Sequence, residues 1–146
     1  DIQRSRGLGD VYKRQQQIMS DKFTVEIISP DQTILKQETN EVIIPSFEGQ
    51  MGILNNHIPL ITFLRPGIIT IKAEGEKKYY VEEGTVEFSN NNLLILTSTA
   101  KDVAHLDKSK INDLIEKAEA NLNTQSTDKE RYVASYKLET LKEISQ

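Results

Sequence analysis

The stretch EVIIPSFEGQMGILNNHIPLITFLRPG, residues 41–67, decides how this chain folds. Three glycines and three prolines interrupt a run that is otherwise rich in Ile, Leu, Val and Phe. Glycine permits backbone shapes that other residues resist, and proline fixes φ and removes a hydrogen-bond donor. The stretch therefore predicts a strand, a shaped loop, a second strand and a tight turn at Arg65-Pro66-Gly67. Gly52 is predicted to be a position where only glycine fits.

Short strands separated by turn residues continue on both sides of this stretch. Phe23, Val25 and Ile27 alternate with Thr24 and Glu26, a pattern typical of a half-buried strand. Further strands are expected at 34–38, 42–44, 68–73, 77–82, 85–88 and 93–97, with turns between them. Many short strands at a spacing of about 8–12 residues predict a β-sandwich domain over residues 20–100.

The hydrophobic period changes after Ala100. Apolar residues at helical spacing predict a helix over 107–122, with Asp107 as its N-cap. Thr127 and Glu130 have the spacing of a capping box and predict a second helix that runs to about Ile144. Residues 101–146 are therefore expected to form an antiparallel αα-hairpin.

The hairpin is too small to bury much apolar surface by itself, so it has to pack on the sandwich or on another protein. The apolar residues of the second helix are spread widely around it, which leaves two readings open. The helix is either packed permanently on the sandwich or meets different surfaces in different states. Its basic residues are candidates for pairing with acidic groups of a partner; they are Lys129, Arg131, Lys137 and Lys142.

Composition excludes several classes of function. The chain has no cysteine, which rules out disulfides, thiolate metal sites and cysteine nucleophiles. A formal net charge of −4 argues against non-specific binding to nucleic acid, which requires a basic surface. No apolar run approaches the roughly 20 residues that span a bilayer, so membrane association has to come through a partner or a surface contact.

The polar segment at residues 1–19 does not fit the pattern that follows it. It has no apolar run of the kind found in secretory signals. We expect a disordered leader or artefact, with the natural start at Met19.

No catalytic or metal-binding arrangement is evident in the sequence. The two histidines, His57 and His105, are far apart and have no cluster of ligands beside them. Gly49 and Gly52 lack the lysine and the helix start of a phosphate-binding loop. His57 is instead expected to hydrogen-bond the backbone of its loop. We predict no enzymatic activity, no cofactor and no metal.

The order of residues in 41–67 resembles the N-terminal domain of the ε subunit of F-type ATP synthase. That family typically reads V-x-x-P-x-x-x-G-x-x-G-[ILV]-x-x-x-H-x-P-[IL]-[IL]-x-x-L-x-x-G. The matching positions are Val42, Pro45, Gly49, Gly52, Ile53, His57, Pro59, Leu60, Leu64 and Gly67. The similarity spans roughly residues 22–145 and implies a ten-stranded N-terminal β-sandwich followed by two C-terminal helices.

The resemblance also implies a function. Such a chain is a non-catalytic subunit of the proton-translocating ATP synthase, bound to the γ subunit at the foot of the central stalk and resting on the c-ring. It helps to transmit ring rotation to the catalytic β subunits, and its C-terminal helices can reach the α and β subunits and restrain ATP hydrolysis. It lies at the cytoplasmic face of the bacterial inner membrane, held there only through the complex.

By the same resemblance, one loop is the expected contact with the c-ring, and four residues are expected to shape the structural loop. The c-ring candidates are Ser46, Phe47, Glu48, Gly49 and Gln50. The structural residues are Pro45, Gly52, His57 and Pro59.

Some bacterial members bind ATP through an [IL]-D-x-x-R-A segment at the start of the first C-terminal helix. Leu106 and Asp107 match this segment, but Lys110 and Ile111 stand where the family has Arg and Ala. Lysine keeps the charge and lacks the planar fork of arginine. We therefore expect ATP binding to be absent or weak, with Asp107 acting as a helix cap.

The alternative from another class is a free-standing β-sandwich module that binds a ligand such as a carbohydrate. Modules of that kind usually present Trp or Tyr platforms. This chain has no Trp, and its five tyrosines are scattered. Binding to a γ subunit would distinguish the two functions.

Overall fold

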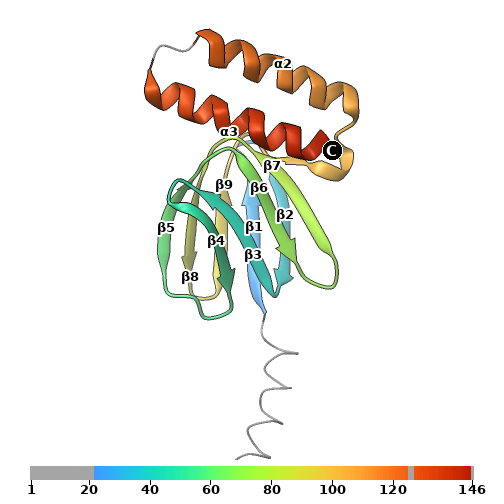
Figure 1. Cartoon of the computed structure of the whole chain (residues 1–146). Coiled ribbons are helices and arrows are strands. Elements are labelled where there is room, and N and C mark those ends of the chain that lie inside the picture. The colour runs from blue at the N-terminus through green and yellow to red at the C-terminus, as the bar shows by residue number, and fades with distance from the viewer. Residues whose placement is uncertain (1–21, 125–126, 146) are drawn as a thin grey trace, which may run out of the picture.

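The computed structural model describes residues 22–124 and 127–145, and the expected leader at 1–19 lies outside them. In the described residues the strands come before the helices α2 and α3 (Figure 1), and there are ten of them. They are β1 (Phe23–Ile28), β2 (Thr33–Thr39), β3 (Glu41–Ser46), β4 (Gly49–Leu54), β5 (Leu60–Leu64), β6 (Gly67–Lys72), β7 (Glu76–Val81), β8 (Gly84–Ser89), β9 (Asn92–Leu96) and β10 (Lys101–Asp102).

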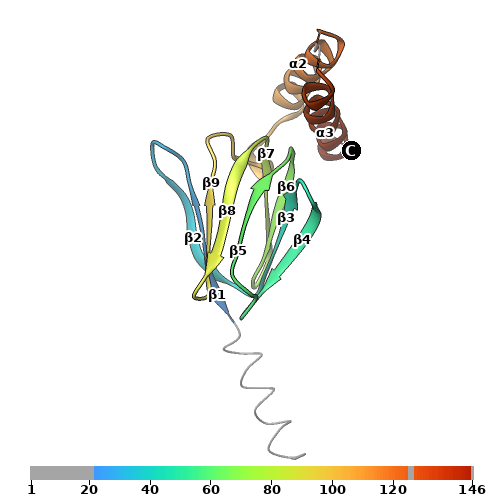
Figure 2. The same cartoon turned by 90° about the vertical axis from the view of Figure 1, so that its left-hand side faces the viewer.

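All ten strands belong to one curled sheet. Their order is β10-β7-β6-β3-β5-β8-β9-β1-β2, with β4 added to β3. Every pair is antiparallel except β1 with β9. The sheet curls so that β1, β2, β8 and β9 face β3, β4, β6 and β7 (Figure 2). The predicted fold of about ten short strands followed by two helices is confirmed, and the two layers of the sandwich are parts of a single sheet.

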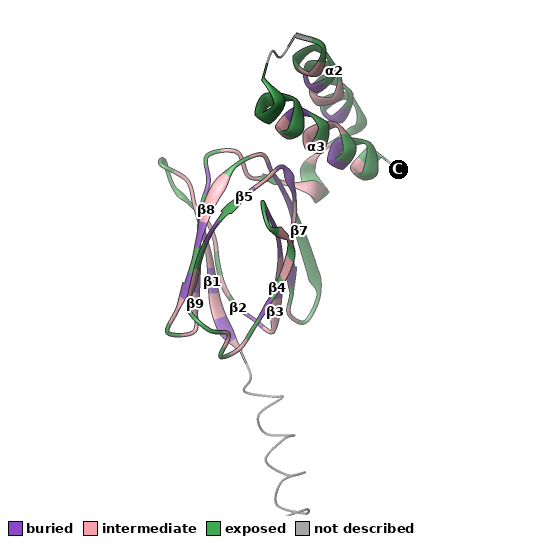
Figure 3. Cartoon of the chain, turned by 60° about the vertical axis from the view of Figure 1, so that its left-hand side comes forward, coloured by how far each residue is buried: buried purple, intermediate pink, exposed green. Residues whose placement is uncertain are grey.

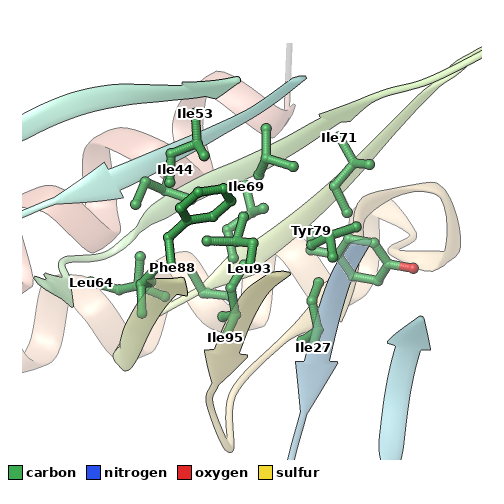
Figure 4. Packing of buried hydrophobic residues seen from close by; sticks show 14 of the residues in the cluster. Ile27, Ile44, Ile53, Leu64, Ile69, Ile71, Tyr79, Phe88, Leu93 and Ile95 are labelled. Carbon is green, nitrogen blue, oxygen red and sulfur yellow. The ribbon is translucent and has the colours of Figure 1, made fainter. Parts of the chain in front are cut away.

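The core lies between the two layers of the sheet (Figure 4). The alternation that predicted β1 buries Phe23, Val25 and Ile27, each at most 2% exposed. The ring of Phe23 meets that of Phe88 edge to face, with centroids 5.6 Å apart. Full burial of an apolar side chain of this size contributes about 1.5–3 kcal/mol, so the shared inner face holds the layers together.

Residues 41–67 form three strands. β3 and β4 are a hairpin whose pairing runs from Glu41 with Leu54 to Ser46 with Gly49. Only Phe47 and Glu48 lie between the strands, and Gly49 has a φ of 124°, a conformation that glycine tolerates and other residues rarely adopt. The shaped loop comes later, at residues 55–59.

The predicted requirement for glycine at position 52 is wrong. Gly52 lies within β4, opposite Ile43 and exposed, and its φ is outside the left-handed region. A Cβ there would have the carboxylate of Glu41 as its nearest contact, at 3.5 Å. At Gly67 a Cβ would lie 2.5 Å from the Cβ of Pro45, so the steric requirement falls there. Pro45 and Gly52 are strand residues, whereas His57 and Pro59 lie in the loop.

The C-terminal helices are α2 (Lys108–Thr124) and α3 (Asp128–Ser145), preceded by the short 3-10 helix η1 (Val103–His105). Asp107 caps α2 as predicted, because its Oδ1 accepts from the backbone N–H of Lys110 at 2.8 Å. The Oγ1 of Thr127 accepts from the N–H of Glu130 at 3.1 Å, which is the N-cap bond of the predicted capping box. β10 pairs with β7 just beyond Ala100, so the sheet ends two residues after the expected domain boundary.

Candidate interaction surfaces

The turn between β3 and β4 has a fixed backbone and a partly exposed tip. The Oγ of Ser46 donates to the carbonyl of Gly49 at 2.7 Å and accepts from the N–H of Glu48 at 3.2 Å. The N–H of Phe47 donates to the carbonyl of Phe63 at 3.1 Å. Ser46 is fully buried, whereas Glu48 and Gln50 are exposed and Phe47 is 42% exposed. The turn therefore presents Phe47 and Glu48 from a rigid support.

The αα-hairpin packs on the sandwich around Tyr80 of β7. Tyr79 and Val81 point into the sandwich core, so the alternation of the strand turns Tyr80 to the other face. Tyr80 is fully buried against Ala118 of α2 and Leu141 of α3. Figure 3 shows most of the remaining hairpin surface exposed. The apolar cluster between the hairpin and the sandwich is therefore centred on one aromatic side chain.

Burial raises the pKa of Tyr80 well above the usual value of a phenol, and the nearby carboxylate of Glu82 raises it further. Among the described residues the hydroxyl of Tyr80 has no hydrogen-bond partner. A buried hydroxyl without a partner costs about 1–3 kcal/mol. Tyr80 thus supplies apolar area to the docking of the hairpin and at the same time a polar group that weakens it.

A second group of contacts, which we call the aromatic stack, consists of Phe47, Tyr132, Tyr136 and Arg65. Phe47 stacks on Tyr132 with ring centroids 6.3 Å apart and planes at 19°. Tyr132 and Tyr136 meet edge to face at 4.6 Å, and their hydroxyls are 3.2 Å apart. The guanidinium of Arg65 lies 4.1 Å from the centre of the Tyr136 ring. The stack joins the β3–β4 turn and the turn between β5 and β6 to one turn of α3.

The basic residues predicted on the second helix differ in their surroundings. Lys137 pairs with Glu82 of the sandwich, with Nζ and Oε2 3.0 Å apart. Lys129, Arg131 and Lys142 are exposed. The structure therefore pairs Lys137 with the sandwich and places Lys129, Arg131 and Lys142 at the surface of α3.

An apolar stripe lies on the outer face of the β5–β8–β9 layer. Ile61 and Phe63 of β5 are 71% and 61% exposed, and Leu96 of β9 is 46% exposed. Phe63 pairs with Thr85 of β8, which in turn pairs with Leu96, so the side chains lie in register across the sheet. Sequence analysis missed this stripe, although apolar residues at four of the five positions 60–64 were a sign that both faces of β5 are largely apolar.

The stripe continues into a groove between the end of the sandwich and α3. Its apolar lining includes Phe63 and Leu96 of the stripe, Phe47 of the turn and Val133 of α3. Lys129 and Lys137 lie along the helix side. The turn, the stripe and the docked helix thus border one continuous surface.

The nucleotide candidates are occupied in structural roles. Leu106 packs against the cluster around Tyr80, and Asp107 caps α2. Ile111 is buried, and Lys110 is exposed. The carboxylate of Asp107 is engaged by the backbone of α2, and the two lysines of the segment, Lys108 and Lys110, are exposed. Weak or absent ATP binding stays a prediction.

The two histidines serve local contacts. The Nδ1 of His57 lies 2.8 Å from the carbonyl of Ile58, and its ring meets Phe88 edge to face at 5.9 Å. His105 is exposed beside Asp102 of the sheet edge. Within residues 22–124 and 127–145, no group of three or more His, Cys, Asp or Glu side chains could hold a metal. No helix in that part of the chain is long and apolar enough to cross a membrane.

Comparison with known proteins identifies relatives of the whole arrangement. Residues 22–103 match the model of the ATP synthase Delta/Epsilon chain β-sandwich domain. The chain is 46% identical over 130 residues to the ATP synthase epsilon chain of Pelagibacter ubique, an alignment that covers 87% of this chain and 100% of that relative. It is 39% identical over 103 residues to the epsilon chain of Dichelobacter nodosus, with 69% and 72% covered.

A solved structure supports the same fold. A chain in the cryo-EM structure of the Euglena gracilis mitochondrial ATP synthase, described as OSCP/F1/c-ring in rotational state 1, superposes with a TM-score of 0.71 at 22% identity. The match covers 86% of this chain and 82% of that one. Together with the ten-stranded sandwich and the docked αα-hairpin, the sequence matches show that this chain belongs to the family of ATP synthase epsilon chains, the non-catalytic subunits of the central stalk.

Proposed function

We propose that this chain is the adaptor of the central stalk that binds the γ subunit, rests on the c-ring and helps to transmit ring rotation to the catalytic β subunits. The observation that carries this proposal is the apolar stripe of Ile61, Phe63 and Leu96, held in register on a rigid sheet. Exposed apolar groups that cluster on a monomer mark a protein-binding surface. A rigid sandwich with such a face suits a part that has to pass on torque.

The stripe is our candidate for the γ contact. It combines two branched aliphatic side chains with one aromatic ring, and the flanking groove extends it toward α3. Aromatic side chains are enriched where interfaces bind most strongly. Each large side chain of the stripe that a partner buries would contribute about 1.5–3 kcal/mol of transfer free energy to binding. The cost of association has to be subtracted from that gain.

The β3–β4 turn is our candidate for the c-ring contact. Ser46 fixes its backbone, and Phe47 and Glu48 project from it. A short rigid turn with one apolar and one charged side chain suits the polar loops of a ring better than a long mobile segment would. Attachment to γ and the ring would hold the chain peripherally at the cytoplasmic face of a bacterial inner membrane.

The hairpin is proposed to be a regulatory element that restrains ATP hydrolysis by reaching the α and β subunits when it leaves the sandwich. Its docking contact is small, and it contains an unpartnered hydroxyl at Tyr80. A two-state element requires the docked and released forms to lie within a few kcal/mol of each other. When the hairpin leaves the sandwich, the basic residues Lys129, Arg131, Lys137 and Lys142 would pair with acidic groups on the catalytic subunits.

Binding to γ tests the central proposal. Ile61→Asp combined with Phe63→Asp in the full chain should lower affinity for the cognate γ subunit by at least about tenfold, because two charges would enter an apolar contact. Leu54→Asp is the matched control, because Leu54 is also exposed, at 55%, but lies on β4 outside the stripe. Titration calorimetry measures both. Equal affinity of the double variant and the control would exclude the stripe as the γ contact. A folded wild-type chain that does not bind γ would exclude the proposed role as an adaptor of the central stalk.

A further inference from the structure

The aromatic stack connects the sandwich to the αα-hairpin. On the sandwich side, the N–H of Arg65 donates to the carbonyl of Pro45 at 2.9 Å and the N–H of Phe47 to that of Phe63 at 3.1 Å. Both stack residues of the sandwich are therefore anchored to the backbone around the β3–β4 turn. On the helix side, Tyr132 and Tyr136 lie one helical turn apart. α3 thus contacts the side chain at the tip of the turn directly.

Phe47 belongs both to the tip of the β3–β4 turn and to the contact with α3. One face of its ring lies against Tyr132, while 42% of the residue is exposed. A ring presents only two flat faces, and α3 covers one of them while Val133 and Lys129 border the groove alongside. A partner that packs on the tip of the turn therefore meets both the Phe47 ring and the helix that covers it.

We propose that Phe47 is shared between α3 and the c-ring, so that docking of the hairpin and contact of the turn with the ring compete. This inference rests on the proposed ring contact and adds a regulation to it. By thermodynamic linkage the competition works in both directions. Binding of the turn to the c-ring favours release of the hairpin, and docking of the hairpin lowers the affinity of the turn for the c-ring.

The contacts have a strength that allows such an exchange. An exposed stacked pair and an exposed cation–π contact each change an equilibrium by about two- to tenfold. The ion pair of Lys137 with Glu82 and the apolar cluster around Tyr80 hold the hairpin independently of the stack. Loss of the stack should therefore shift the docking equilibrium without unfolding either unit.

The first test measures docking in the isolated full chain. Because the chain has no cysteine, Glu74→Cys on the β6–β7 hairpin and Glu119→Cys on α2 provide two unique sites for spin labels. Pulsed dipolar spectroscopy then gives the populations of docked and released hairpin. Phe47→Leu and Tyr132→Leu should each lower the ratio of docked to released by about two- to tenfold, and the double variant no further than the single ones.

Leu54→Ala is the matched control for this cycle. Leu54 is another apolar residue of the sandwich, 55% exposed, that pairs with Glu41 at the end of the β3–β4 hairpin away from the turn, and its replacement should leave the docked population unchanged. Additive effects of Phe47→Leu and Tyr132→Leu, or no effect of either, would overturn the proposal. An equal effect of Leu54→Ala would do the same, because it would show a general loss of apolar surface.

The second test uses the assembled enzyme in membranes. A photoreactive label at Glu48→Cys should cross-link to the c-ring, and Tyr132→Leu should raise the yield by about two- to tenfold. In the Phe47→Leu background, Tyr132→Leu should change nothing. If the label cross-links to the c-ring but Tyr132→Leu does not change the yield, the competition is overturned and the ring contact stands. Absence of cross-linking in every variant would overturn the ring contact together with the competition, whereas γ binding would still test the wider function.

Discussion

Individual glycines in the stretch 41–67 have different physical roles despite their similar appearance in the sequence. A side chain at Gly67 would collide with Pro45, while a side chain at Gly52 would meet only the flexible end of Glu41. The collision involves a proline ring within the sheet, which cannot turn aside. The steric requirement for glycine is therefore a property of the neighbouring strand and is invisible in the spacing of the glycines.

Gly67→Ala should lower the free energy of unfolding by about 1–3 kcal/mol, the range for an overpacked site. Gly52→Ala is the matched control and should change it by less than about 0.5 kcal/mol, as exposed substitutions usually do. Urea denaturation of the two variants and the wild type measures the difference. Equal stability of the two variants would show that β3 and β6 can move apart at no cost.

Ionisation of Tyr80 should affect the stability of the folded chain. In the unfolded chain a phenol loses its proton near pH 10, whereas burial, assisted by Glu82, holds the pKa of Tyr80 higher in the folded chain. Above that pH the unfolded state binds fewer protons than the folded state, so stability falls as pH rises. The contribution is complete below about pH 10 and is lost progressively above it.

Tyr80→Phe should therefore reduce the loss of stability between pH 8 and pH 10.5 while keeping stability at pH 8 close to that of the wild type. The hydroxyl that it removes has no partner among the described residues, so its loss leaves no group unsatisfied. Urea midpoints at the two pH values are the measurement. Tyr79 also has a raised pKa through burial, so a smaller pH dependence remains. The same pH dependence in both proteins would contradict the assignment.

At the scale of elements, α2 begins where a side chain satisfies its first free backbone groups. The side-chain Oδ1 of Asp107 accepts from the N–H of Lys110 at 2.8 Å. The backbone carbonyl of Asp107 accepts from the N–H of Ile111 at 3.0 Å. This cap occupies one of the two residues that match the ATP-binding segment of the family. The N-terminus of α2 and a bound nucleotide would therefore compete for the carboxylate of Asp107.

Asp107→Ala should destabilise α2 by about 1 kcal/mol through loss of the cap. Asp113→Ala, an exposed substitution inside the same helix, should have a much smaller effect. Circular dichroism during urea denaturation compares them, and calorimetry with ATP should show no tight binding to any of the three proteins. Tight binding that disappears only in Asp107→Ala would establish a nucleotide site.

The whole molecule consists of a large rigid unit and a small unit attached to it by few contacts. The sandwich keeps its own core, and the hairpin shares with it chiefly the Tyr80 cluster, the Lys137–Glu82 pair and the aromatic stack. Removal of the hairpin should therefore leave the sandwich folded. The cut belongs after His105, because β10 and η1 follow Ala100 and cover the edge of β7.

A chain that ends after His105 should support proton-driven ATP synthesis by the assembled enzyme and raise its ATP hydrolysis. Both rates are measured on membranes with equal amounts of bound subunit, quantified against γ. Loss of assembly would show that the hairpin is structural. A rate of ATP hydrolysis that is unchanged across ATP concentrations would show that the hairpin does not inhibit hydrolysis in this chain. That result would favour a hairpin packed permanently on the sandwich.

The sequence by itself determined the elements and their family. The period-two alternation of β1, the change to helical spacing after Ala100 and the caps at Asp107 and Thr127 are local signals, and each predicted what formed. Only the tertiary structure decided which side chains meet. The curl of the sheet brings Pro45 onto Gly67, aligns Phe63 with Leu96 in one stripe and sets Phe47 against Tyr132 of α3. Such contacts depend on strand register and on the docking of the hairpin, which join residues far apart in the chain and therefore leave no periodic trace in the sequence.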